Sequence, residues 1–253
     1  MYYKNSAFFE PSDEDLKIWR YMNFHNFSLM LKEKALHFSR LDTLQDKFEG
    51  VLSEVRYETP FERLEFVGRI FGEKIAAKMK AGVAAYNENI RKSVAVNCWH
   101  MNDCESDAMW DLYATRHAGI AVQSTFKNLR ECLNESESYF AVIGVVTYVN
   151  YENDYVPEFV PLSRIMHKRL SFQHERELRA VVSLKPFESL SSALSEISRD
   201  GVNVQVDLKK LIEKVYVSPD SEQCFLSRVK SVMSKNYPSK EVVLSSLAEN
   251  PKF

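Results

Sequence analysis

The feature that most constrains the fold is the stretch 172–182, in which charges alternate and then give way to apolar side chains. If this stretch is a β-strand, its period of two places Glu175, Glu177 and Arg179 on one face. Leu178, Ala180 and Val182 then lie on the other face, which points toward a core. Two carboxylates beside a guanidinium can form a general base, a ribose-binding site or half of a metal site. An edge strand with solvated ion pairs gives the same pattern, so both interpretations stay open.

Length and composition predict one globular domain over residues 1–253. The chain has 253 residues, of which 45% are hydrophobic and 27% charged, as is ordinary for a soluble protein. Its net charge of −2 gives no global basic field and does not favour bulk non-specific binding of nucleic acid, although it leaves room for a local basic groove. No apolar run approaches the roughly 18 residues of a membrane span, and the N-terminus lacks the apolar segment of a secretory signal. We therefore expect a cytoplasmic protein with no membrane association.

Two large classes of site are set aside by what the motifs lack. The four cysteines form no C-x-x-C pair, and the neighbours Cys98, His100 and Cys104 have no second cluster that would complete a zinc site. The chain has seven glycines, with no G-x-G-x-x-G and no G-K-[ST] motif, so folds that cradle phosphates with such loops are not expected. No metal is predicted.

Apolar periodicity predicts strands that alternate with helices. The expected strands, besides that in 172–182, are 18–22, 35–40, 94–99, 119–124, 141–148, 202–206, 215–218 and 241–245. The expected helices are 23–34, 60–92, 108–113, 125–132, 162–171, 208–213 and 222–235. We predict an α+β fold with a mixed, mostly antiparallel sheet, flanking helices and a helical insertion at about 60–92. The segment 162–171 reads as a basic helix, whose charged face suits either phosphate groups or solvent.

Several segments resemble a bacterial family catalogued as a domain of unknown function, number 2971, whose activity is not settled. The segments span residues 18–247 in order: Trp19 to Met22, Leu36 to Arg40, Asp46 to Gly50, Cys98 to Asn102, Glu105-Ser106, Met109 to Tyr113, Gly119 to Ala121, His167-Lys168, His174 to Arg179 and Val215 to Pro219. Where a motif of this family often reads Asp-Pro-Phe-Glu, the chain has Asp46-Lys47-Phe48-Glu49, so a different turn is expected there.

A further resemblance is to the ADP-ribosyltransferase fold. The strand with Arg20, the amphipathic helix after it and the strand ending in Phe38-Ser39 resemble the opening of that fold, and Glu175 or Glu177 resembles its late catalytic acid. The resemblance implies that the arginine holds the phosphates of NAD. It implies that the glutamate binds the ribose 2′-hydroxyl and stabilises an oxocarbenium-like transition state as nicotinamide leaves. The chain departs from the pattern because it has no clear Ser-Thr-Ser segment and because two glutamates compete for one role.

Nine residues are candidates for the site. His100 and Asn102 follow a predicted central strand, where ligands collect, and Trp99 beside them suits either a stacking wall or the core. The expected catalytic residues are Glu175, Glu177 and His100, and the expected substrate-binding residues are Arg20, Tyr21, Ser39, Trp99, Asn102 and Arg179. This assignment requires Arg20 and Glu175 to line one cleft although they lie far apart in the sequence.

The leading hypothesis is an enzyme that acts on NAD or a nucleic-acid-linked substrate by ADP-ribosyl transfer or glycosidic cleavage. A toxin or phage-defence effector with a protein partner fits the bacterial context of the resemblance. Two alternatives stay open at this point. One is a sensor or binding module without catalysis, in which the charged strand is a salt-bridged scaffold. The other is a magnesium-dependent nuclease that uses Glu49, Glu105, Glu175 and Glu177.

Overall fold

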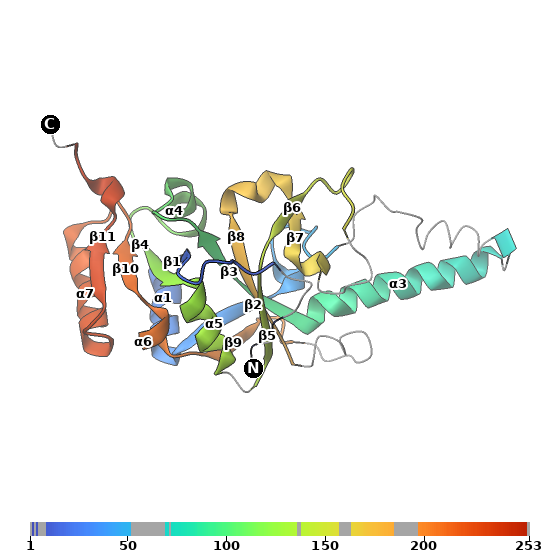
Figure 1. Cartoon of the computed structure of the whole chain (residues 1–253), viewed down its shortest axis with the longest axis horizontal. Coiled ribbons are helices and arrows are strands. Elements are labelled where there is room, and N and C mark those ends of the chain that lie inside the picture. The colour runs from blue at the N-terminus through green and yellow to red at the C-terminus, as the bar shows by residue number, and fades with distance from the viewer. Residues whose placement is uncertain are drawn as a thin grey trace.

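A mixed, mostly antiparallel sheet forms the centre of the computed structural model (Figure 1), which describes residues 2, 4, 9–51, 69–70, 72–135, 138–156, 163–184 and 197–251. Its main path has the order β11 (Glu241–Leu244), β10 (Lys214–Val217), β4 (Gly119–Thr125), β1 (Lys17–Asn23), β3 (Val94–Met101), β2 (Ala35–Arg40) and β9 (Val202–Gln205). β8 (Glu177–Ser183) pairs with β3 and with β5 (Phe140–Val145). Among the paired strands of this sheet that the structure describes, β10 and β11 alone are parallel, which confirms the predicted α+β class.

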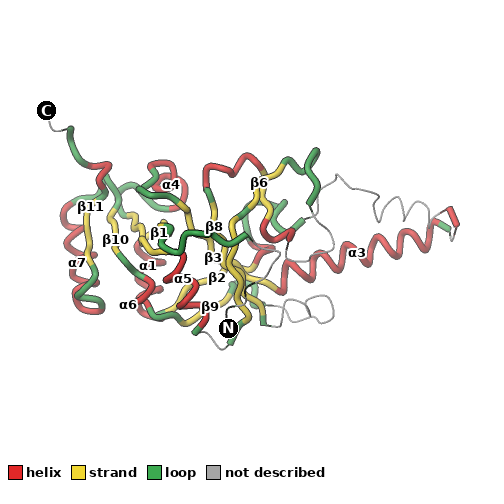
Figure 2. Tube along the Cα trace, viewed as in Figure 1, coloured by secondary structure: helices red, strands yellow, loops and turns green. Residues whose placement is uncertain are grey.

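Helical segments cover both faces of the sheet (Figure 2). One face carries α1 (Phe24–Glu33), α5 (Phe126–Asn134), α6 (Leu208–Leu211) and α7 (Gln223–Asn236), whose apolar residues share one core cluster. The remaining segments are α3 (Glu73–Ser93), α4 (Asp107–Tyr113) and the 3-10 turns Leu41–Thr43, Ser163–Met166, Leu170–Glu175 and Ser246–Ala248. Asn23, Thr125 and Asp207 begin α1, α5 and α6 because each side chain accepts a hydrogen bond from a main-chain N–H of the first turn.

The two faces of the sheet have cores of different extent. The alternate positions Leu178, Ala180 and Val182 point into the large core under the helices, as their period of two predicts. On the opposite face the apolar residues form two smaller clusters, one around Val96 and Val181 and one around Trp19, Tyr21 and Trp110. Polar residues of β3 and β8 lie on this second face between the two clusters.

The sheet opens between β1 and β2, which share one edge of β3. β1 pairs with the end of β3 only at Ile18 and Trp19, and β2 pairs with its beginning only at Ser39 and Arg40. Between these short ladders, side chains replace the strand-to-strand hydrogen bonds. Asn97 donates to the carbonyl oxygen of His37 over 2.8 Å, and its own side-chain oxygen accepts the indole N–H of Trp99 over 2.7 Å.

Several predicted elements differ from the structure. The strand expected within 172–182 begins only at Glu177, after a 3-10 turn. The expected strand 141–148 is divided, because β5 ends at Val145 and β6 (Thr147–Val149) pairs in parallel with β7 (His167–Arg169) in a separate two-stranded ladder. The expected helix 162–171 is wrong: its described residues form a 3-10 turn, β7 and the start of a second 3-10 turn. Ile165 and Met166 pack in the apolar cluster around Val96 and Val181, whereas Lys168 reaches the carboxylates beside it, so the buried residues form no single helical stripe.

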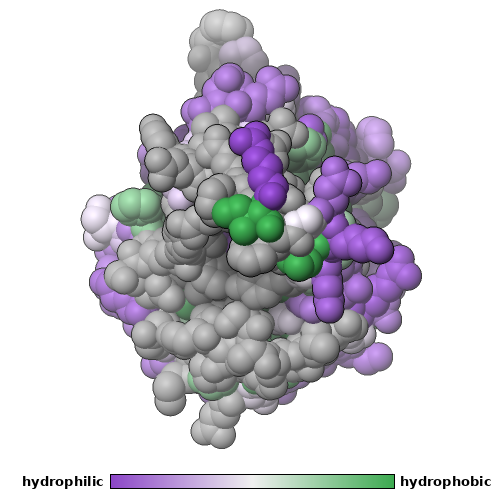
Figure 3. All heavy atoms as spheres, turned by 90° about the vertical axis from the view of Figure 1, so that its right-hand side faces the viewer, coloured by the Kyte–Doolittle hydropathy of each residue, from purple (hydrophilic) through white to green (hydrophobic). Residues whose placement is uncertain are grey.

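The helical segment at about 60–92 is described only in part. α3 covers Glu73–Ser93 and projects away from the sheet at the right of Figure 1, whereas 60–68 and residue 71 lie outside the described residues. Figure 3 views the molecule from this end, and the described side chains there are mainly hydrophilic with a small hydrophobic group. No described helix combines the length and the apolar composition that crossing a bilayer requires.

Replacing Asn97 with alanine should destabilise the fold, because Asn97 is 1% exposed and bridges the opening of the sheet. The indole N–H of Trp99 would lose its partner, and an unpaired buried donor costs about 1–3 kcal/mol. Urea unfolding should show this loss, whereas Asn236→Ala on the exposed end of α7 should change the unfolding free energy by no more than about 0.5 kcal/mol. Equal midpoints for the two variants would contradict the structural role of Asn97.

Candidate active site

A cleft of about 370 Å³ lies on the second face of the sheet, between its two small apolar clusters. β1, β3 and β8 supply its floor, and α4, the loop after β2 and the segment 163–175 supply its walls. Its polar lining includes Arg20, Tyr21, Ser39, Asp46, Glu49, Cys98, His100, Tyr113, Lys168, Glu175, Glu177 and Arg179. Arg20 and Glu175 therefore line the same cleft, which their assignment to one site requires.

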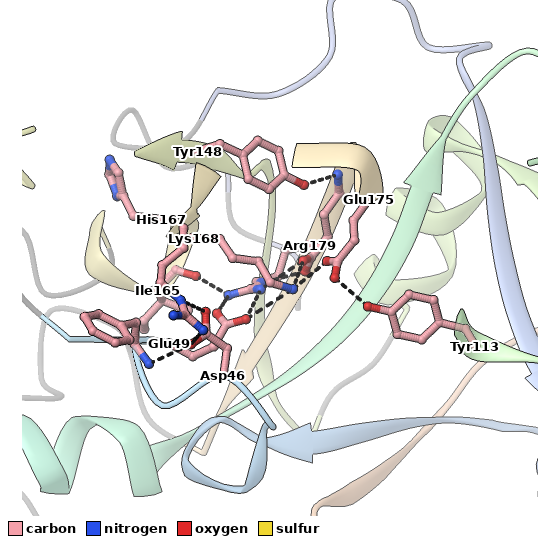
Figure 4. Close-up of polar contacts among 12 residues, drawn as sticks. Asp46, Glu49, Tyr113, Tyr148, Ile165, His167, Lys168, Glu175 and Arg179 are labelled. Carbon is pink, nitrogen blue, oxygen red and sulfur yellow. Dashed lines mark hydrogen bonds and ion pairs between the residues drawn. The ribbon is translucent and has the colours of Figure 1, made fainter. Parts of the chain in front are cut away.

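Arg179 is fully buried and holds two carboxylates at the bottom of the cleft (Figure 4). Its guanidinium donates to both oxygens of Glu177 over 2.6 and 3.0 Å, and to both oxygens of Glu49 over 2.8 and 3.2 Å. A further hydrogen bond of 2.6 Å reaches the carbonyl oxygen of Ile165. All five N–H donors of this side chain are thereby used, so we assign Arg179 to the scaffold of the cleft rather than to ligand contact.

Lys168 brings a second cation to the same carboxylates. Its Nζ atom lies 2.5 Å from Glu175, 3.3 Å from Glu177 and 3.3 Å from Glu49. Burial alone would lower the pKa of Lys168, but the negative charges of these carboxylates outweigh burial and raise that pKa. The ammonium group is thus charged throughout the physiological pH range.

Glu175 differs from Glu177 in backbone position and in partners. The chain places Glu175 at the end of a 3-10 turn, followed by Arg176 in the left-handed region at φ 41°, and β8 begins only at Glu177. The prediction that Glu175 and Glu177 occupy one strand face is therefore wrong. Glu175 contacts no arginine among the described residues: its oxygens accept from Lys168 and, over 2.5 Å, from the hydroxyl of Tyr113.

Arg20 lies in the opening of the sheet. Its guanidinium donates to the carbonyl oxygens of Cys98 over 3.2 Å and His37 over 3.4 Å. In the part of the chain that the structure describes, no carboxylate pairs with it. Burial lowers the pKa of Arg20, but a guanidinium stays charged at neutral pH. Arg20 thus offers an uncompensated positive charge to a ligand.

His100 presents a lone pair at the floor of the cleft. Its Nδ1 atom lies 2.6 Å from the carbonyl oxygen of Glu175, which can only accept, so Nδ1 carries the proton. Burial lowers the pKa of His100, which favours the neutral ring, and its Nε2 atom has no hydrogen-bond partner among the described residues.

The other expected site residues are placed differently from one another. Tyr21 and Ser39 line the cleft, and the hydroxyl of Tyr21 accepts from the main-chain N–H of Ser106. Trp99 also borders the cleft, but it is 1% exposed and packs in the large core. Asn102 does not belong to the lining: its side chain accepts from Arg176 and its carbonyl oxygen accepts from Trp19.

Sequence reasoning missed three residues of the cleft. Lys168 is predicted on the basic helix, and Tyr113 is not among the nine expected site residues although its hydroxyl donates to Glu175. Glu49 is expected as a magnesium ligand of the nuclease alternative and is likewise not among the nine. The sequence signal for both residues was charge balance. A buried Arg179 requires carboxylates such as Glu49, and several buried carboxylates require a further cation such as Lys168.

The geometry gives no support to the magnesium-dependent nuclease. Glu105 points elsewhere, since it accepts from the indole N–H of Trp110 and from the N–H and hydroxyl of Ser246. The other three carboxylates already bind Lys168 and Arg179. Among the described residues, no group of three or more His, Cys, Asp or Glu side chains is arranged to hold a metal ion.

A second hollow of about 400 Å³ adjoins the cleft. It extends along α1 and β2, with Met22, Leu29 and Met30 on its apolar side. The two hollows share Arg20, Tyr21, Ser39 and Tyr113. Arg20 consequently lies between two neighbouring hollows.

Comparison with known proteins adds two distant likenesses. The chain resembles Thermus sp. 2.9 DarT in complex with carba-NAD+, with a TM-score of 0.41, 8% identity, and coverage of 94% of this chain and 100% of that chain. It also resembles Thermus sp. 2.9 DarT in complex with NAD+, with a TM-score of 0.42, 9% identity, and coverage of 95% and 100%. No family model and no curated protein matches the chain, so its resemblance to family 2971 stays a prediction. The fold of this chain is established by its own strand pairings and not by these low TM-scores.

The charge on Glu177 should stabilise the fold in a pH-dependent way. Burial alone would raise the pKa of Glu177, but the positive charges of Arg179 and Lys168 outweigh burial and lower that pKa to about 2. A folded-state pKa below the unfolded value of about 4.3 means that the contribution is complete above pH ~4.3 and is lost as the pH falls toward 2. Urea unfolding of wild type and Glu177→Gln should therefore give free energies that converge over this range.

The matched control for this experiment is Glu249→Gln, which removes an exposed carboxylate. Its unfolding free energy should follow that of the wild type at every pH. A difference between wild type and Glu177→Gln that is constant from pH 6 to pH 2.5 would contradict the lowered pKa.

Proposed function

We propose that this chain is an ADP-ribosyltransferase that binds NAD+ in the cleft, breaks the bond between nicotinamide and ribose, and passes the ADP-ribosyl group to an acceptor. The observation that carries the proposal is the arrangement of charge in one cleft. At one end, Arg20 offers a positive charge with no carboxylate partner among the described residues. At the other, Glu49, Glu175 and Glu177 outnumber Lys168 and Arg179 by one negative charge.

This polarity matches a ligand with an anionic middle and a cationic end. NAD+ has a pyrophosphate that suits a guanidinium and a pyridinium ring that suits a site of net negative charge. With the pyrophosphate at Arg20, the two halves of the dinucleotide fit the two hollows that meet there. Their volumes of about 370 and 400 Å³ lie in the usual range of ligand pockets.

Glu175 is the carboxylate that we assign to the reacting ribose. Departure of nicotinamide leaves positive charge on the ribosyl centre, and a carboxylate fixed beside it stabilises this transition state. Glu177 and Glu49 are less suited, because each is held at both oxygens by Arg179. The partners of Glu175 are a hydroxyl and a flexible ammonium, which a substrate can replace. Glu177 and Arg179 orient the site.

Neutralising Glu175 should separate binding from chemistry. Glu175→Gln keeps the shape of the side chain but removes its charge, so nicotinamide release from NAD+ should fall by about 10²–10³-fold while binding of NAD+ is largely retained. Arg20→Met should instead weaken binding, since it removes the charge that faces the phosphates. Chromatography of released nicotinamide and calorimetry of NAD+ binding measure the two effects.

Controls for these variants come from exposed positions. Glu249→Gln and Arg228→Met remove one charge each on the surface and should leave both release and binding unchanged. Binding of NAD+ without any release, in wild type and with every acceptor tried, would favour the sensor or binding module. Absence of binding would refute the proposal.

We further propose that the acceptor is a single-stranded nucleic acid. A row of aromatic and cationic side chains runs from the mouth of the cleft: the guanidinium of Arg169 lies 4.8 Å from the ring centre of Phe48 and 5.4 Å from that of Phe172. Phe172 lines the cleft, and His174 stacks on it at 6.5 Å. Alternating rings and cations suit unpaired bases and phosphates. Such an activity would fit a cytoplasmic toxin or phage-defence effector with a protein partner.

Phe48→Leu should weaken binding of a single-stranded oligonucleotide, because it removes an exposed ring of this row but no residue of the cleft. Loss of one stacked base is worth about 1–3 kcal/mol, so the dissociation constant should rise about fivefold or more. Fluorescence anisotropy with a labelled oligonucleotide measures the change, and Phe140→Leu, at a ring of similar exposure, is the matched control. Unchanged affinity in Phe48→Leu would exclude this face as the acceptor site.

A further inference from the structure

Lys168 places one positive charge in the middle of three of the carboxylates that line the cleft. Its ammonium group has three N–H donors, and Glu175, Glu177 and Glu49 lie at 2.5, 3.3 and 3.3 Å. The side chain is buried, but it comes from β7, which belongs to the small β6–β7 ladder and not to the main sheet. Figure 4 shows it reaching toward Arg179 and Glu175.

The two cations that pair with these carboxylates are held in different ways. Arg179 uses all five donors on fixed partners and is fully buried. Lys168 is a flexible side chain, and besides the carboxylates it has the ring of Phe172, whose centre lies 4.8 Å from Nζ. A cation that arrives at Glu175 can therefore displace the ammonium toward an aromatic face that already borders the cleft.

We propose that Lys168 sets the charge selectivity of the cleft, that is, how strongly it prefers the cationic nicotinamide ring of NAD+ over the neutral dihydronicotinamide ring of NADH. This inference rests on the proposed function. The five paired groups Glu49, Glu175, Glu177, Lys168 and Arg179 together carry one net negative charge. Without Lys168 they sum to two, and without Glu49 they sum to zero. NAD+ and NADH differ at this ring in charge and little in size, so their affinity ratio reports the charge of the cleft.

A cycle of variants tests the inference by calorimetric titration with each dinucleotide. Lys168→Met should raise the preference for NAD+ over NADH, and Glu49→Gln should lower it, each by about tenfold for one charge several ångströms away. The double variant Lys168→Met/Glu49→Gln restores one net negative charge and should return to the ratio of the wild type. Far-ultraviolet circular dichroism establishes that each variant is folded.

The outcomes separate this inference from the proposed function. A wild-type protein that binds neither dinucleotide refutes the proposed function. A wild-type protein that binds NAD+ and releases nicotinamide, but whose affinity ratio stays the same in Lys168→Met and Glu49→Gln, overturns only the role of Lys168. If one variant does not fold, the ratio in the other two decides, because a purely structural lysine would change the affinities for NAD+ and NADH by the same factor.

Discussion

The structure of the cleft depends on the buried guanidinium of Arg179. An unpaired charge in this position would be prohibitively unfavourable, so the fold must bring two carboxylates and a carbonyl oxygen to it. Glu177 comes from the same strand, Glu49 from the loop after β2, and Ile165 from a 3-10 turn. One side chain thereby fixes three segments that are far apart in the sequence, and with them the walls of the cleft.

Pairing with Arg179 also distinguishes Glu177 from its neighbour Glu175. Arg179 holds Glu177 at both oxygens, whereas the left-handed conformation of Arg176 turns the chain so that Glu175 leaves the strand. Glu175 then meets a hydroxyl and an ammonium in place of the guanidinium. Two carboxylates that look equivalent in the sequence thus have different partners because a single backbone turn separates them.

Local periodicity predicted most of the sheet but little of the segment that leads into β8. Strands such as β1, β3 and β4 were predicted from their apolar and β-branched residues, most of which are buried. The segment 163–175 has a helix-like composition, but its residues are bound to distant partners: Lys168 to Glu49, Arg169 to Asp46, and Ile165 to Arg179. Such contacts are not encoded in spacing. The convergence of Arg20 and Glu175 could be proposed from a resemblance, but the role of Lys168 could be seen only once the charges were placed.

The cleft reaches Arg20 because the sheet is incomplete where two strands share one edge of β3. A continuous ladder would satisfy the carbonyl oxygens of Cys98 and His37 with main-chain donors and would leave no room for a side chain. Since β1 and β2 each pair with only two residues of that edge, Arg20 and Asn97 supply the missing donors. Two neutral carbonyl oxygens leave the positive charge of the Arg20 guanidinium uncompensated, whereas a carboxylate partner would balance it. The gap in the sheet therefore places an uncompensated cation between the two hollows. A single ligand that occupied both hollows would pass Arg20 at its middle, so an anionic group at that point of the ligand would be favoured.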